Sequence, residues 1–285
     1  MKKLLFAFAF IAATLSTNAQ KLENSTLWKI TGNGLEEPSY LFGTIHITCD
    51  ATLSDKVKLA LNKTSQIVLE IDMDDPALQG KMMGGMMMKG GKSLKDLVSK
   101  EEYAKIDSLF INNMGMSVSL MQTVKPFFLS AMFYPKMIDC PVQSFELEIM
   151  KVAKEQKEEV YGLETIEDQI QVFEDIPYSE QVKELLRSAN DNLAYDRSVI
   201  KRLLEVYKSE NITGMLDMMS EEGANITANF QDEMLDQRNK NWIPRIEEFA
   251  KKKPTFFGVG AGHLAGKNGV IKLLRKAGFT VTAVK

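Results

Sequence analysis

Histidine is almost absent from this sequence, with only His46 and His263 among 285 residues. Any chemistry that needs an imidazole near neutral pH must therefore use one or both of them. The sequence also lacks a long run of basic residues, and its formal net charge is −3, so nucleic acid is not an expected partner. A Gly-x-Ser-x-Gly motif is missing as well, which disfavours a serine hydrolase.

Cysteine is equally scarce, with only Cys49 and Cys140. In an oxidising compartment these two residues can form a disulfide, but their distance in sequence neither supports nor excludes the pair. Cys49 lies three residues after His46, so a thiolate ligand is conceivable. We rank that role below a disulfide and below a buried thiol.

The N-terminus has the features of a cleavable export signal. Lys2 and Lys3 precede an apolar stretch, residues 4–15, which is too short for a membrane-spanning helix. Small residues up to Ala19 offer a cleavage site. We therefore expect residues 1–19 to be a signal peptide of bacterial type and the mature protein to be periplasmic or secreted, without a transmembrane segment.

Both histidines follow an apolar, strand-like run and a glycine at the same offset. Gly43 begins the Gly-x-x-His motif that ends at His46, and Gly260 begins the one that ends at His263, with Gly262 inside it. Chemistry in α/β proteins gathers in loops just beyond strand ends. The sequence therefore predicts that the fold brings the two imidazoles together.

The remaining pattern predicts an α/β (α+β) fold with a mixed central sheet flanked by helices. Alternating residues at 27–30 and the run at 40–45 indicate an N-terminal β-hairpin. The region from about 94 to 250 is mostly helical in pattern and forms a large insertion. We expect residues 20–285 to form a single domain. Further short strands are expected at 66–72, 159–164, 255–259 and 279–284.

Residues 79–92 contain five methionines and five glycines in clusters. A mobile loop is the simplest interpretation, since glycine disfavours regular structure. A flexible apolar lid or adaptable contact surface is the next alternative. A methionine-lined copper site ranks below both.

Glu70 interrupts an apolar strand. A buried carboxylate needs a partner, so Glu70 either faces solvent on an edge strand or faces the two histidines. In the second case His46, His263 and Glu70 form a set that suits a divalent metal ion such as Mn, Zn or Co. The same residues can also work without metal, with His46 as general base.

Five stretches in order resemble the TraB/GumN (PrgY) family, which is related to the Tiki metalloproteases and to the erythromycin esterase/ChaN-like superfamily. They are Leu41-Phe-Gly-Thr-Ile-His46, Val68-Leu-Glu-Ile71, Tyr161-Gly-Leu-Glu-Thr165, Gln237-Arg-Asn239 and Gly258-Val-Gly-Ala-Gly-His-Leu264. The resemblance covers nearly all of the mature chain and implies an α/β fold with a mixed central sheet. It also implies one pocket that contains both histidines, Glu70 and Arg238, and Glu164 and Asn239 match the family pattern too. Where relatives tend to have Gly-x-Asp, this sequence has Ser144-Phe-Glu146, and we expect Glu146 to lie outside the site.

Three functions fit these residues. The first is an exported metal-dependent hydrolase, a Tiki-like metallopeptidase that acts on a peptide or protein. The second is a non-catalytic binder that sequesters a peptide signal or haem, and the third is a metal-free esterase with His46 as base. The expected catalytic residues are Glu70, Arg238 and His46; the expected metal ligands are His46, His263 and Glu70; the expected substrate-binding residues are Gly43, Gly260, Gly262, Glu164 and Asn239.

Overall fold

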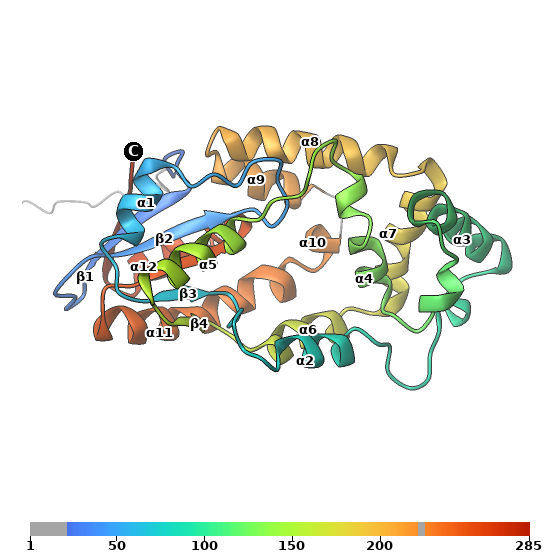
Figure 1. Ribbon diagram of the computed structural model, residues 1–285, viewed down its shortest axis with the longest axis horizontal. Helices are drawn as coiled ribbons and strands as arrows, with labels where there is room; N and C mark the ends of the chain where they lie inside the picture. Colours follow the sequence, from blue (N-terminus) through green and yellow to red (C-terminus); the bar gives the residue numbers. More distant parts are fainter. Residues whose placement is uncertain (1–21, 222–225) are drawn as a thin grey trace, which may run out of the picture.

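A six-stranded mixed sheet is the centre of the computed structural model, which describes residues 22–221 and 226–285 (Figure 1). The strands lie in the order β4-β3-β5-β2-β1-β6. Their bounds are Leu27–Gly32 (β1), Ser39–Thr44 (β2), Ile67–Leu69 (β3), Val160–Gly162 (β4), Phe256–Gly260 (β5) and Phe279–Ala283 (β6). This confirms the predicted fold class. The expected signal peptide lies outside the described residues.

The directions of the strands determine at which edge of the sheet their carboxyl ends lie. β1 and β2 form the expected antiparallel hairpin, with Leu27 opposite Phe42, and β6 pairs antiparallel with β1. β2, β5, β3 and β4 are parallel neighbours. The carboxyl ends of four adjacent strands therefore meet at one edge of the sheet, where α/β proteins usually bind ligands.

Apolar side chains alternate between the two faces of the sheet, as the two-residue period of a strand requires. Leu41 and Phe257 point into one cluster, whereas Phe42 and Phe256 point into the other. The first cluster is covered mainly by α11 (Gln237–Lys252) and α12 (Val270–Lys276), together with α9 (Ile212–Met219). The second is covered mainly by α1 (Asp55–Leu61) and α5 (Phe145–Gln156).

A third apolar cluster belongs to the helical region and lies away from the sheet (Figure 1). Its buried centre includes Phe110 and Phe133, whose ring centroids are 4.7 Å apart. Between residues 94 and 250 the described chain is mostly helical, as expected, and β4 is its one named strand. The other α-helices of this region are α3 (Lys100–Met114), α4 (Pro126–Ala131), α6 (Ile166–Asp175), α7 (Tyr178–Asp191), α8 (Ala194–Lys208) and α10 (Ile226–Asn229).

The methionine- and glycine-rich segment is a helix for half of its length, so the prediction of a mobile loop is wrong there. α2 spans Leu78–Gly85 and lies beside α6 (Figure 1). The carbonyl of Gly85 accepts a hydrogen bond from buried Lys125, and a Cβ on Gly85 would stand 2.1 Å from Ile170. Tertiary contact thus overrides the weak helix propensity of glycine. Met83 remains 64% exposed.

Cys49 and Cys140 form a disulfide, which answers the question that the sequence left open. Cys49 is therefore no thiolate ligand. Among the described residues, no helix combines the length and the apolar character needed to span a bilayer.

Candidate functional site

Each of the four parallel strands carries a polar side chain just beyond its carboxyl end. His46 follows β2, Glu70 follows β3, Glu164 follows β4, and His263 ends a short 3-10 turn after β5. Gly260 lies where three of them converge. A Cβ at Gly260 would be 3.3 Å from Glu70 Oε1, 3.6 Å from His263 Cδ2 and 3.7 Å from His46 Nε2. The two histidines therefore face one small region, although they are far apart in sequence.

Glu70 faces the two histidines and not the solvent, because β3 lies inside the sheet. Its Oε1 accepts the Gly260 backbone N–H at 2.8 Å. Its Oε2 accepts Arg238 Nη2 at 2.7 Å and Gln169 Nε2 at 3.1 Å. Burial alone would raise the pKa of Glu70, but Arg238 and both histidines outweigh it and hold the pKa well below its usual range. Glu70 is thus an ionised, nearly buried carboxylate.

Arg238 bridges two carboxylates. It lies in the first turn of α11, directly after a π-helical turn (Asp232–Asp236), a rare geometry that is frequent at functional sites. Besides Glu70, it donates to Glu164 Oε1 from Nε at 3.0 Å and from Nη2 at 2.6 Å. Glu164 also accepts the indole N–H of Trp242 at 2.9 Å. Arg238 is therefore fixed in one plane beside the histidines.

His263 is buried and neutral. The Asn239 amide nitrogen donates to the Asn268 carbonyl at 3.0 Å, so the amide oxygen faces His263 and accepts Nδ1–H at 2.7 Å. Nε2 therefore carries a lone pair, which accepts Arg238 Nη1 at 3.2 Å. Burial, assisted by the charge of Arg238, lowers the pKa of His263 to about 3.

His46 has the opposite environment, because its side chain is 67% exposed. Its Nδ1 donates to Glu146 Oε1 at 2.9 Å. Glu146 also accepts the hydroxyls of Thr44 and Ser144, each at 2.6 Å. Desolvation works against a charged imidazole, yet the hydrogen bond to Glu146 and the charges of Glu70 and Glu146 raise the pKa of His46 to about 9.

The expectation that Glu146 lies outside the site is wrong, because its carboxylate holds His46. The Cys49–Cys140 disulfide and a backbone pair between Thr48 and Gln143 bring the two segments together. The signal was available in the sequence, since Glu146 keeps the negative charge of the family's Gly-x-Asp motif.

The residues expected to bind substrate lie at the site, but most are engaged with other protein groups. The Gly43 carbonyl accepts the Tyr207 hydroxyl at 2.8 Å, and a Cβ on Gly262 would stand 2.8 Å from Met219 Sδ. The Asn239 residue is 2% exposed and the Glu164 side chain 8%. Of the five expected residues, Gly260 is the one whose missing Cβ leaves space between the histidines and Glu70.

The donor set has the chemistry that a divalent metal ion requires. Each imidazole anchors Nδ1 on an oxygen acceptor and turns Nε2 towards the region beside Glu70, as metal-binding histidines do. In the part of the chain that is described, however, no three His, Cys, Asp or Glu side chains form a ready-made metal group. Binding through His263 Nε2 would require Arg238 to give up its contact there.

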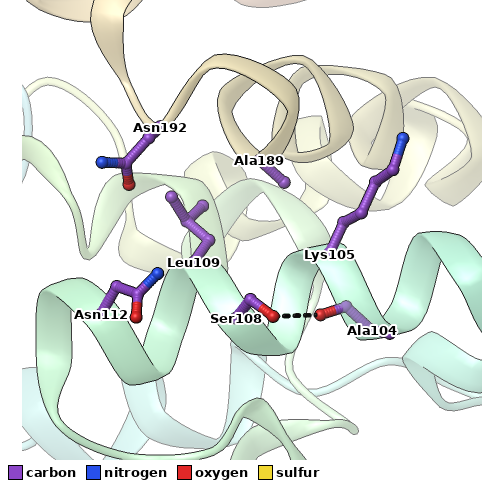
Figure 2. A pocket seen from close by; sticks show the side chains of 7 residues that line it. All are labelled: Ala104, Lys105, Ser108, Leu109, Asn112, Ala189 and Asn192. Carbon is purple, nitrogen blue, oxygen red and sulfur yellow. Dashed lines mark hydrogen bonds between the residues drawn. The ribbon is translucent and has the colours of Figure 1, made fainter.

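A separate hollow of about 440 Å³ lies between α3 and α7 (Figure 2). Figure 2 shows Asn112, Asn192 and Lys105 around it. Neither histidine, Glu70 nor Arg238 lines this hollow, so it is not part of the cluster at the strand ends.

Known proteins are similar to this chain at low identity. Metalloprotease TIKI1 of Danio rerio is 23% identical over 316 residues, which cover 90% of this chain and 63% of that protein. Metalloprotease TIKI2 of Danio rerio is 19% identical over 326 residues (92% and 61%). Metalloprotease TIKI1 of Homo sapiens is 22% identical over 314 residues (90% and 61%). The chain thus spans less than two thirds of the length of these relatives.

The TraB/PrgY/gumN family model matches residues 26–283, a range that runs from the start of β1 to the end of β6. It includes both histidines, Glu70, Glu146 and Arg238. The chain therefore belongs to the TraB/PrgY/gumN family.

Proposed function

We propose that this protein is an exported metal-dependent hydrolase that cleaves a peptide or protein substrate. The observation that carries the proposal is the pair of anchored imidazoles, whose Nε2 atoms converge beside an ionised carboxylate. The relatives named metalloproteases support the same reaction class. The disulfide fits an oxidising compartment outside the cytoplasm.

In this proposal His46, His263 and Glu70 would hold a divalent ion such as Mn, Zn or Co. Such an ion polarises a carbonyl and makes water acidic enough to attack it near neutral pH. Glu146 keeps the His46 ring in one orientation, and Asn239 keeps His263 in the tautomer that has its lone pair on Nε2.

Arg238 is the group best suited to stabilise developing negative charge. Its Nη1 donates to the Met234 carbonyl and to His263, while Glu70 and Glu164 hold the rest of the guanidinium. When a ligand displaces the contact with His263, Nη1 becomes a donor that points into the site. A preorganised donor of this kind contributes roughly 10²–10³-fold to turnover in known hydrolases.

One observation favours a non-catalytic binder as the second candidate. Arg238 already donates to Glu70, Glu164 and the lone pair of His263, so these three groups have hydrogen-bond partners without a metal. A binder of this kind would hold a peptide at the same strand ends and release it unchanged.

Metal analysis combined with a peptide-library assay separates the two candidates. The purified protein is stripped with a chelator, loaded with Mn²⁺, Zn²⁺ or Co²⁺, and its metal content and its cleavage of the library are measured. We expect about one ion per chain and cleavage that disappears with the chelator. Tight peptide binding without cleavage, under every metal, would establish the binder instead.

Glu70→Gln tests the carboxylate within that assay. The amide has nearly the same size but no charge, and Arg238 keeps Glu164 as its partner, so the fold should persist. Turnover should fall about 10²–10⁴-fold, the usual contribution of a general acid–base group. Glu101→Gln, an exposed change on α3, is the matched control and should leave turnover intact.

A further inference from the structure

The loop that carries His46 is joined to the loop that precedes Glu146 by a disulfide and by hydrogen bonds to Gln143, among them one from the Ala51 N–H to its side-chain oxygen at 3.1 Å. Cys49 and Cys140, 91 residues apart in sequence, form a disulfide with their Cα atoms 5.6 Å apart. Next to it, the Thr48 N–H donates to the Gln143 carbonyl at 3.1 Å, and the Gln143 N–H donates back at 2.8 Å. The disulfide and the backbone pair both involve residues that lie within six positions in sequence of His46 or Glu146, which are hydrogen-bonded to each other.

The two histidines differ in how they are supported. His263 is 4% exposed, lies against the Trp242 ring and has a partner on each ring nitrogen. His46 lies in residues 45–54, which contain no helix and no strand apart from the bridge at Thr48, and its ring is mostly exposed. Packing therefore fixes His263, whereas the position of His46 depends on the fastened loop and on Glu146.

We propose that the Cys49–Cys140 disulfide is a positioning element for His46, and that its reduction releases this imidazole from Glu146 while the sheet and His263 stay in place. Cys49 is exposed, so a small dithiol can reach the bond. The dithiol gives up two electrons and two protons and closes to its own disulfide, and the two protein sulfurs become thiols. The consequence for turnover rests on the proposed hydrolase function.

The location of the disulfide explains why its effect is local. It joins two irregular segments beyond the end of β2, and none of the hydrogen bonds that hold His263, Glu70 or Arg238 involves these segments. Opening it removes the covalent link at Cys49, so that only hydrogen bonds to Gln143 connect the two segments. The strand pairs of β2 with β1 and β5 stay intact.

Selective ¹⁵N labelling of histidine tests the proposal, because the protein has only two histidines. In the oxidised protein both rings should show a hydrogen-bonded Nδ1–H, which His46 donates to Glu146 and His263 donates to Asn239. Glu146→Ala identifies the His46 signals, because it removes the acceptor of that ring alone. A dithiol, or the double variant Cys49→Ser/Cys140→Ser, should move the His46 signals to those of Glu146→Ala, in which the acceptor is gone. The His263 signals and the circular dichroism spectrum should not change.

The double variant is also the control for the reagent, since the chain holds no other cysteine. The dithiol should produce no further change in it. Zn²⁺ affinity, measured by calorimetry, should fall about 10- to 100-fold on reduction, the usual effect of losing a group that orients a metal-binding histidine.

Two results would overturn the proposal. If thiol titration shows an open disulfide while the His46 signals keep their oxidised positions, the disulfide does not position His46. If the His263 signals and the circular dichroism collapse together with those of His46, the disulfide supports the whole fold. The spectra require neither metal nor substrate, so the hydrolase proposal can fail in its own assay while this one stands, and the reverse also holds.

Discussion

At the scale of single residues, Gly260 determines how much space the site has. The missing Cβ leaves open the point between His46 Nε2, Glu70 Oε1 and the His263 ring. Its φ of −54° and ψ of 134° are values that any residue adopts, so the backbone does not need glycine here. The space beside the three side chains is the physical reason for a glycine at this position.

Gly260→Ala should therefore impair function without impairing the fold. The new methyl group would lie 3.3–3.7 Å from the three side chains and displace whatever occupies the point between them. We expect metal affinity or turnover to fall about 100-fold, as small misplacements in active sites do, while the midpoint of thermal unfolding stays the same. Gly84→Ala, in open space on α2, is the control. A variant with unchanged affinity and turnover would place the functional centre elsewhere.

Glu146 should make the stability of the protein depend on acid pH. Desolvation would raise its pKa, but the hydrogen bond and charge of His46, with Ser144 and Thr44, lower it from 4.5 to about 2. A carboxyl group with a depressed pKa stabilises the folded state above its unfolded pKa, and this stabilisation is lost as the pH falls from about 4.5 to about 2. The shift corresponds to about 3 kcal/mol.

Urea unfolding at a series of pH values measures this effect. Glu146→Gln should be less stable than the wild type at pH 7 and should lose less stability between pH 4.5 and pH 2. Glu70 makes the free energy of unfolding fall as the pH falls in both proteins, because the pKa of Glu70 is also depressed. Identical slopes for wild type and variant would mean that His46 and Glu146 do not interact in solution.

At the scale of elements, the ends of β3 and β4 fit together through Gly162. A Cβ on Gly162 would stand 2.6 Å from the Glu164 carbonyl oxygen and 2.7 Å from the Asp72 backbone nitrogen. Backbone atoms cannot move aside as a flexible side chain does. These two strand ends also carry Glu70 and Glu164, which hold Arg238.

Gly162→Ala should therefore reduce both stability and turnover. Overpacking typically costs about 1–3 kcal/mol, and the forced separation of the strand ends should loosen Arg238. Denaturant unfolding measures the first effect and the peptide-cleavage assay the second. Gly80→Ala, which meets no neighbour, is the matched control. Full turnover in a destabilised variant would show that the strand ends tolerate separation.

The sequence was sufficient to predict the strands and the convergence of the two Gly-x-x-His motifs. The strands are short and rich in apolar residues, and the two-residue period appears directly in the cores on either face. The sequence left two alternatives for the direction in which Glu70 faces, because a carboxylate inside an apolar strand requires either solvent or a partner. The structure then excluded the solvent-facing alternative, because β3 lies between two other strands of the sheet.

Features that depend on contacts between distant segments could not be derived in the same way. α2 is stabilised at Gly85, whose carbonyl accepts a hydrogen bond from Lys125 and whose Cα packs against Ile170, although the residues of α2 themselves favour a loop. Glu146 reaches His46 through the Thr48–Gln143 pair and the disulfide, neither of which leaves a local pattern in the sequence. The orienting roles of Asn239 and Glu164 likewise depend on partners in other elements.

At the scale of the whole molecule, one helix links the sheet to the helical region. α8 contributes Ile200 to the apolar cluster around Phe110 and Tyr207 to a cluster on the sheet. The Tyr207 hydroxyl also donates to the Gly43 carbonyl, at the start of the first histidine motif. Figure 1 shows α8 extending between the two parts. This continuity supports the expectation that residues 20–285 unfold as one domain.

Phe110→Ala tests that expectation, because Phe110 is fully buried in the apolar cluster of the helical region. Removing a buried phenylalanine ring costs about 3–5 kcal/mol. If the chain is one cooperative unit, hydrogen exchange of the Phe257 amide in β5 should accelerate by about 100-fold or more, since each ~1.4 kcal/mol is a factor of ten. Faster exchange confined to α3, α4 and α7, with β5 unchanged, would instead show that the helical region unfolds separately and that α8 joins two independent units.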